Sequence, residues 1–162
     1  MKVLIVDDSR LDAELAAREL KRAGMALQVR VATREREFRS ALEEFAPEVI
    51  LCDSSFRDFD GLSALRIGGE LAPTTPVIFL TGTVGVERTI VAMRHGAVDY
   101  VLKRNLKRLP DAVKRATEDA REKAARRAAE AELEAMREWM TALLENVDSV
   151  LSSFSLREMR YH

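Results

Sequence analysis

Five short runs rich in Val, Ile and Leu, separated by stretches with helical spacing, constrain the fold more than any other feature of this chain. Apolar runs of this length are typical of buried strands. A strand–helix alternation repeated five times makes a parallel sheet with helices on both faces. We therefore expect an α/β fold built on a doubly wound, five-stranded parallel sheet. The predicted strands cover residues 3–6, 27–32, 49–52, 77–80 and 98–102.

The segments between these strands carry apolar residues three and four positions apart, which is the spacing of an amphipathic helix. Ser9 is placed to cap the first helix. We expect Gly68 and Gly69 to weaken or end the third helix, and Gly96 to close the fourth. A fifth helix is expected to begin near Leu106. The residues that mark the first four helices are Leu11, Leu15 and Leu20; Phe38, Ala41, Leu42 and Phe45; Leu62 and Leu65; and Ile90, Val91 and Met93.

A change in composition separates a compact part of the chain from a helical extension. All seven glycines lie between Gly24 and Gly96, and the last proline is Pro110. Residues 110–138 contain no glycine and consist largely of alanine and charged residues, which is the composition of a long helix. The sequence therefore predicts a compact domain over residues 1–120 and an extended helix over residues 121–162.

The overall composition excludes several classes of protein. Lys and Arg number 26 against 27 Asp and Glu, which argues against a nucleic-acid binder that relies on bulk positive charge. One cysteine, Cys52, excludes an internal disulfide and a cysteine-based zinc site, and its position predicts a small core residue. The N-terminus turns acidic too early for a signal peptide, and no apolar run approaches the ~20 residues that span a bilayer. We expect a cytoplasmic protein without a nucleic-acid or membrane partner.

Charged and hydroxyl side chains follow four of the five predicted strands. Asp7 and Asp8 follow the first strand, Asp53 the third, Thr81 the fourth and Lys103 the fifth. Parallel strands end at one edge of the sheet, so these side chains are expected to lie close together. Three neighbouring carboxylates repel one another unless a cation is present, and Mg²⁺ is the usual one beside a phosphate. A carboxylate nucleophile, a metal ion and a lysine together indicate phosphoryl transfer onto an aspartate.

Four segments carry a resemblance to a known family. They are the acidic pair in VLIVDDS, the segment VILCDSSFRDFDG, the segment FLTG and the segment GAVDYVLK. Found in this order at the ends of the first, third, fourth and fifth predicted strands, they resemble the receiver domain of two-component response regulators over about residues 1–120. The resemblance implies a flavodoxin-like sheet with strand order 2-1-3-4-5.

The resemblance also implies a metal site and a phosphoacceptor. Asp53 would accept the phosphoryl group and share the binding of Mg²⁺. Asp8 would bind Mg²⁺ directly, Asp7 would help through water, and the backbone carbonyl of Ser55 would supply a further ligand.

The resemblance also implies which residues contact the phosphoryl group and which change conformation after phosphorylation. Lys103 would pair with the phosphoryl group, and Thr81 and Tyr100 would be the switch residues. Two positions depart from the family pattern, because Arg57 and Arg104 stand where prolines are common. Within the family, the lifetime of the phosphoryl group varies with the side chains at two positions, which are Ser55 and Thr83 here. Neither side chain would position a water molecule for hydrolysis, so slow dephosphorylation is expected.

The function implied is that of a phosphorelay component rather than an enzyme with a separate substrate. It would take a phosphoryl group from a sensor histidine kinase or a phosphotransfer protein and signal to a partner or output domain. Two alternatives remain open. One is a receiver-like dimerisation module that does not depend on phosphate. The other is an aspartyl-phosphate phosphatase of the haloacid dehalogenase type, although that class carries Asp-x-Asp after its first strand and Asp7 and Asp8 are adjacent.

The C-terminal segment carries apolar residues at alternating spacings of three and four, which is the heptad pattern of a coiled coil. We expect residues 133–154 to form a parallel homodimer; an amphipathic helix that folds back on its own domain is the alternative. The segment LLENVDSVLSSFSLREMRYH also resembles the entry to a PAS sensor domain, so residues 121–162 could begin a truncated sensor or output domain. The heptad residues are Leu133, Met136, Met140, Leu143, Val147, Val150 and Phe154.

Overall fold

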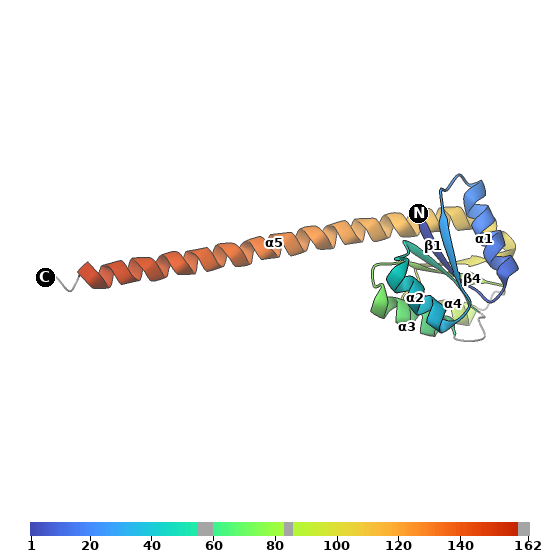
Figure 1. The fold of residues 1–162 in the computed structure, drawn as a ribbon, viewed down its shortest axis with the longest axis horizontal. Helices are drawn as coiled ribbons and strands as arrows, with labels where there is room; N and C mark the ends of the chain where they lie inside the picture. Colours follow the sequence, from blue (N-terminus) through green and yellow to red (C-terminus); the bar gives the residue numbers. More distant parts are fainter. Residues whose placement is uncertain (55–59, 83–85, 159–162) are drawn as a thin grey trace. The chain divides into compact units, whose positions relative to one another are not determined.

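A computed structural model of the chain describes residues 1–54, 60–82 and 86–158. The chain divides into two compact units, Met1–Arg121 and Glu122–His162. The first unit contains a five-stranded parallel sheet in the order β2-β1-β3-β4-β5 (Figure 1). This order confirms the expected doubly wound α/β fold.

The five strands lie where the apolar runs predict them, with each end within one residue of its expected position. Residues of β3 and β4 are buried throughout, because helices cover both faces of the sheet and leave no polar side for water. The strands are β1 (Lys2–Val6), β2 (Gln28–Ala32), β3 (Val49–Asp53), β4 (Val77–Thr81) and β5 (Asp99–Leu102).

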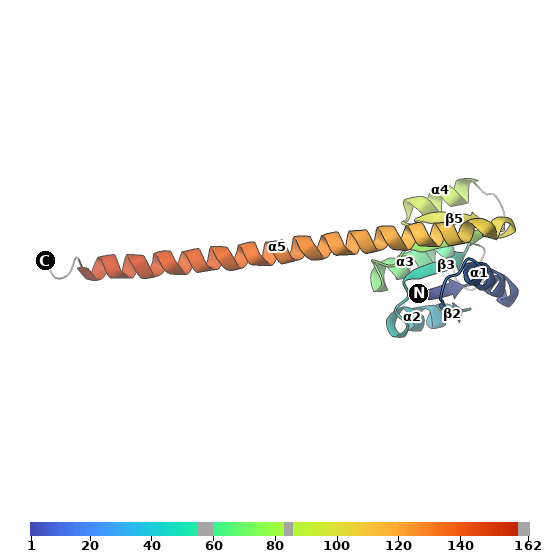
Figure 2. The same cartoon turned by 90° about the horizontal axis from the view of Figure 1, so that it is seen from above.

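The helices cover the sheet in two layers. One core cluster joins a face of the sheet to α2, α3 and α4, and a second joins the opposite face to α1 and the beginning of α5 (Figure 2). Cys52 is buried in the first cluster, as predicted. The helices are α1 (Arg10–Arg22), α2 (Glu35–Glu44), α3 (Gly61–Leu71), α4 (Val86–Arg94) and α5 (Leu109–Glu158), with a short 3₁₀ helix, η1 (Lys103–Arg108), before α5.

The helix α1 begins as predicted, but only one of its three marker leucines is buried. The Ser9 Oγ accepts a hydrogen bond from the Asp12 backbone N–H at 3.2 Å, which confirms the N-cap. The helix marked by Leu11, Leu15 and Leu20 is present, but Leu11 is 65% exposed and Leu15 is 38% exposed, so only Leu20 of the three faces the core. The buried residues of α1 are Ala13, Ala16 and Leu20.

Of the two helix ends predicted from glycines, one differs from the structure and one agrees with it. The helix α3 continues through Gly68 and Gly69 to Leu71. Gly68 is buried against Ile50 and Val77, and this packing stabilises a segment whose local helix propensity is low. By contrast, α4 is followed by Gly96 with a φ of 107°, a left-handed conformation that ends the helix as expected.

The fifth helix begins three residues later than expected, at Leu109 instead of Leu106. Asn105 has a φ of −134° and a ψ of 53°, so the backbone of η1 does not lead directly into the helix. Leu109 is fully buried and Pro110 follows in the first turn, where the missing N–H of proline costs no hydrogen bond.

The second unit consists of the later part of α5. Its seven heptad residues are 43% to 65% exposed in the single chain, with Leu143 the least exposed and Phe154 the most. Within the described ranges, none of the helices combines the length and the apolar character needed to cross a membrane.

Candidate functional site

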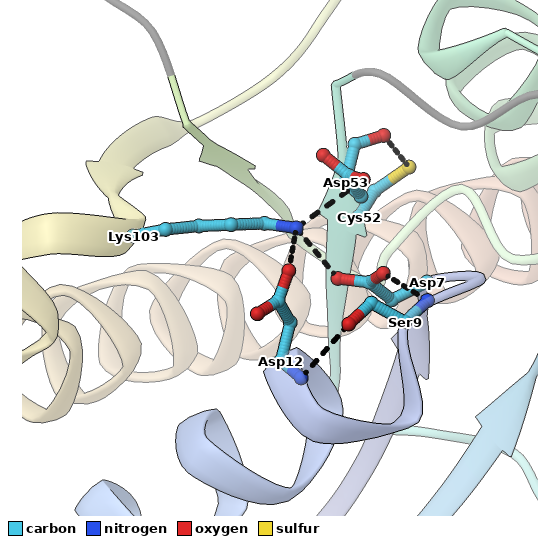
Figure 3. Close-up of polar contacts among 6 residues, drawn as sticks. All are labelled: Asp7, Ser9, Asp12, Cys52, Asp53 and Lys103. Atoms are coloured by element: carbon cyan, nitrogen blue, oxygen red, sulfur yellow. Dashed lines mark hydrogen bonds and ion pairs between the residues drawn. The ribbon is translucent and has the colours of Figure 1, made fainter.

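The site lies at the carboxyl edge of the sheet, where the strand ends bring residues from distant parts of the chain together. Asp7 follows β1, Asp53 is the last residue of β3 and Lys103 follows β5. Asp7 is fully buried and Asp53 is 3% exposed, whereas Asp8 is exposed. The order of the parallel strands therefore places two buried carboxylates and a lysine at one edge (Figure 3).

Asp7, Asp8 and Asp53 form a cluster of carboxylates. Each offers one oxygen atom, and these atoms lie within 4.8 Å of one another. Burial raises the pKa of Asp7, and the charge of Asp53 raises it further, although hydrogen bonds from Lys103 and the Ser9 backbone act in the opposite direction. The structure thus joins the three carboxylates that the sequence placed at strand ends, and their mutual repulsion favours a cation among them.

Lys103 contacts the acidic cluster directly. Its Nζ donates a hydrogen bond to Asp7 Oδ2 at 2.9 Å and lies 3.3 Å from Asp53 Oδ2 (Figure 3). Burial by itself lowers the pKa of Lys103, but the hydrogen bonds to Asp12 and Asp7 and the charge of Asp53 outweigh it and raise that pKa above its ordinary value. Lys103 is therefore a cation held next to the predicted phosphoacceptor.

A residue that the sequence analysis missed completes the surroundings of Lys103. The Asp12 carboxylate accepts a hydrogen bond from Lys103 Nζ at 2.7 Å, the shortest of the three carboxylate contacts (Figure 3). Asp12 lies in the first turn of α1 and not at a strand end, so the search of strand ends could not find it. The sequence does contain a feature that could have identified Asp12. It lies three residues after the N-cap Ser9, and this position places it near the edge where the strands end.

The predicted switch residues lie on neighbouring strands. Thr81 is the last residue of β4 and is 8% exposed, and Tyr100 is half-buried in β5 against the cluster beneath α2, α3 and α4. In the β4–β5 ladder, Thr81 lies opposite Leu102 and Phe79 lies opposite Tyr100. Tyr100 is therefore two residues away from the position that faces Thr81.

Three of the predicted positions lie outside the described residues, whereas Arg104, one of the two departures from the family pattern, lies within them. Ser55, Arg57 and Thr83 fall in ranges that the structure does not describe. Arg104 lies in η1, and the peptide bonds of the described residues are all trans. The ammonium group of Lys103 thus reaches the cluster with arginine, not proline, as the next residue.

The fold and the site together define a class of protein. A parallel sheet of order 2-1-3-4-5 with a carboxylate after its first strand, a carboxylate at the end of its third and a lysine after its fifth is the arrangement of a receiver domain. A family model described as "Response regulator receiver domain" matches residues 3–114. The chain belongs to this family. The match ends before most of α5, so the likeness of the last segment to a PAS domain stays a prediction.

Curated relatives share the receiver region within much longer proteins. The chain is 37% identical over 105 residues to a protein-glutamate methylesterase/protein-glutamine glutaminase of Archaeoglobus fulgidus, a match that covers 64% of this chain and 30% of that protein. It is 35% identical over 101 residues to the DNA-binding transcriptional regulator NtrC of Proteus hauseri, covering 62% and 21%. The chain therefore spans less than a third of the length of these relatives.

Solved structures agree with this assignment. The receiver domain of NtrX from Brucella abortus is 28% identical to this chain, with a TM-score of 0.66 over 72% of this chain and 98% of that one. The longer NtrX chain from the same organism, in complex with ADP, is also 28% identical and has a TM-score of 0.70, covering 76% of this chain and 28% of the other.

Proposed function

We propose that this receiver domain accepts a phosphoryl group on Asp53 in a Mg²⁺-dependent reaction and passes the signal to a partner or output domain. The observation that carries the proposal is the position of Asp53. Its carboxylate is buried at the end of β3, lies in a cluster with Asp7 and Asp8, and is 3.3 Å from the Nζ of Lys103. A nucleophile, a cation and a metal-binding oxygen set are thus in one place.

The donor set fits Mg²⁺. Asp7, Asp8 and Asp53 supply only oxygen ligands, which hard divalent cations prefer, and the lone cysteine is buried with its thiol against the Asp53 backbone carbonyl. We propose that Asp8 and Asp53 hold the ion directly, that Asp7 acts through water and that the Ser55 backbone carbonyl adds a ligand. When bound, Mg²⁺ would supply positive charge to the transferring phosphoryl group.

The proposed chemistry is a single phosphoryl transfer. A carboxylate oxygen of Asp53 attacks the phosphorus of a phosphohistidine, a P–O bond forms and the P–N bond breaks. The imidazole leaves with the bonding electron pair and takes up a proton. Lys103 neutralises negative charge on the phosphoryl oxygens. The donor in this proposal is a sensor histidine kinase or a phosphotransfer protein, and the chain acts on no substrate other than its own phosphoryl group.

The phosphorylated state would be read through Thr81 and Tyr100. A phosphoryl group adds nearly two negative charges and three strong acceptors. The Thr81 hydroxyl, at the end of the strand next to β3, would donate a hydrogen bond to it. Tyr100 would then change position on β5, which alters the surface formed with α4.

The test is incubation of the full chain with Mg²⁺ and phosphoramidate, a small donor with a P–N bond, followed by intact mass. We expect a gain of one phosphoryl group that depends on Mg²⁺ and is absent in Asp53→Asn. Asp119→Asn, an exposed position of α5, is the matched control and should gain the same mass as the parent. A module that works without phosphate would show no gain in any of the three chains. An equal gain in Asp53→Asn would place the acceptor elsewhere.

A second proposal concerns the C-terminal unit, which we propose pairs with a second copy of the chain as a parallel coiled coil through residues 133–154. The exposed heptad residues leave an apolar stripe that soluble proteins rarely expose in isolation. In a parallel pair in register, Glu132 lies opposite Arg137 of the second copy, and Trp139 lies opposite Leu144. Both flanking pairs are complementary, one by charge and one by apolar character.

A further inference from the structure

Lys103 is held by three carboxylates, two at the ends of strands and one in a helix. Asp7 and Asp53 reach its Nζ from strand ends, whereas Asp12 reaches it from the first turn of α1. In Figure 3 the lysine side chain points into the space between these three carboxylates, with Asp12 on the side of α1. The 2.7 Å contact with Asp12 is closer than the 3.3 Å contact with the phosphoacceptor. Asp12 is thus a principal partner of this lysine.

Asp7 cannot serve Lys103 and a metal ion equally well. The inference here rests on the proposed function, in which the oxygen atoms of Asp7, Asp8 and Asp53 face Mg²⁺. Asp7 Oδ2 also accepts a hydrogen bond from Lys103 Nζ at 2.9 Å. Two cations beside one buried carboxylate repel each other, so the metal ion weakens the hold of Asp7 on the lysine.

Asp12 is placed to keep the ammonium group when Asp7 faces the metal ion. Among the described acidic residues, the group that could hold one ion consists of Asp7, Asp8 and Asp53, and Asp12 lies outside it. The backbone N–H of Asp12 donates a hydrogen bond to the Ser9 side chain, which fixes the position from which the Asp12 carboxylate extends. The lysine side chain, by contrast, is a flexible four-carbon stem that needs an anchor at its end.

We propose that Asp12 is a positioning residue that holds the Lys103 ammonium beside Asp53 while Asp7 faces the metal ion. Asp12 does not touch the reacting atoms and acts only through the lysine. Its removal leaves the acceptor and the metal ligands in place but frees the lysine to leave the site on metal binding. The lysine is then absent when the phosphoryl group arrives.

The first test follows the side-chain ammonium signal of Lys103 by NMR in ¹⁵N-lysine-labelled chain, assigned by its loss in Lys103→Arg. Mg²⁺ alone is the probe. We expect the signal to persist at saturating Mg²⁺ in the parent and in Glu14→Gln, which removes an exposed charge from the same helix. In Asp12→Asn the signal is expected to disappear as Mg²⁺ is added, while backbone amide spectra verify the fold. A signal that responds to Mg²⁺ alike in the parent and in Asp12→Asn overturns the proposal.

The second test is the rate of phosphorylation by phosphoramidate. Loss of a partner that orients a metal ligand typically costs about 10–100-fold in activity. By analogy for a partner that orients the lysine, we expect the rate constant of Asp12→Asn to fall by about 10-fold or more. The final mass gain should match the parent, because Asp53 is intact. Equal rates in the parent and the variant would contradict the assignment. If the parent gains no phosphoryl group, the proposed function fails, and the ammonium signal still decides the role of Asp12.

Discussion

Gly61 occupies a position where no larger side chain fits. A Cβ atom at this residue, the first of α3, would overlap the ring of Phe79 on β4. That ring is 4% exposed and packed in the cluster beneath α2, α3 and α4, so it cannot turn aside freely. The absence of a side chain at Gly61 therefore sets how closely the beginning of α3 approaches the sheet, next to the segment that follows Asp53.

Replacing Gly61 by alanine should destabilise the fold. We expect the free energy of unfolding to fall by about 1–3 kcal/mol, the usual cost of forcing extra volume into a packed core. Gly69→Ala in the same helix is the matched control, because a Cβ there meets nothing within 4 Å. That variant should gain up to about 1 kcal/mol from the higher helix propensity of alanine. Urea denaturation of both variants measures the two changes. A Gly61→Ala variant that is as stable as the parent chain or more stable would show that Phe79 does not restrict this position.

At the scale of the element, α1 shows that the largest apolar residues of a helix need not face the core. Its inner face is Ala13, Ala16 and Leu20, whereas Leu11 and Leu15 face outward. Both sets have helical spacing, so periodicity alone cannot choose between them. The outward leucines leave apolar surface on the helix that also carries Asp12.

A pair of identical substitutions distinguishes the two faces of α1. Leu20→Ala removes a fully buried side chain and should lower the free energy of unfolding by about 2–5 kcal/mol. Leu11→Ala changes a residue that is 65% exposed and should alter that free energy by less than about 0.5 kcal/mol. Thermal or urea unfolding gives both values. Comparable losses in the two variants would mean that Leu11 is packed in solution.

At the scale of the whole molecule, every residue from 122 to 154 of the second unit is exposed in a single chain. Leu143, Met140 and Val147 are 43%, 52% and 52% exposed. Most helix stability in proteins comes from packing an apolar face, so a helix of this kind gains from a partner. Burying each large side chain is worth about 1.5–3 kcal/mol before the entropy of association is subtracted.

The full chain is therefore expected to sediment as a dimer at a concentration on the order of tens of micromolar. Leu143→Asp should shift it to monomer, because the substitution places two carboxylates in the apolar seam. Ala142→Asp is the matched control: it adds the same charge one residue away, at an outward heptad position, and should leave the dimer intact. Sedimentation equilibrium measures the oligomeric state of the parent chain and of both variants. A monomeric parent chain, or a dimer that tolerates Leu143→Asp, would contradict the coiled-coil proposal.

The sequence by itself determined the positions of the strands and the carboxylates and lysine at their ends. These features are readable because each depends on a short segment: an apolar run followed by a charged residue. The resemblance to receiver domains rests on the same segments, and the family match over residues 3–114 agrees with it.

Only the tertiary structure decided which face of α1 is buried, that α3 continues through Gly68 and Gly69, and that Asp12 binds Lys103. The last pair is separated by 91 residues, and no local pattern links them. Gly68 is helical because Ile50 and Val77 pack over it, although its propensity favours a break. In each case the outcome depends on packing between elements far apart in the chain, and packing energies exceed the small local preferences that a sequence displays.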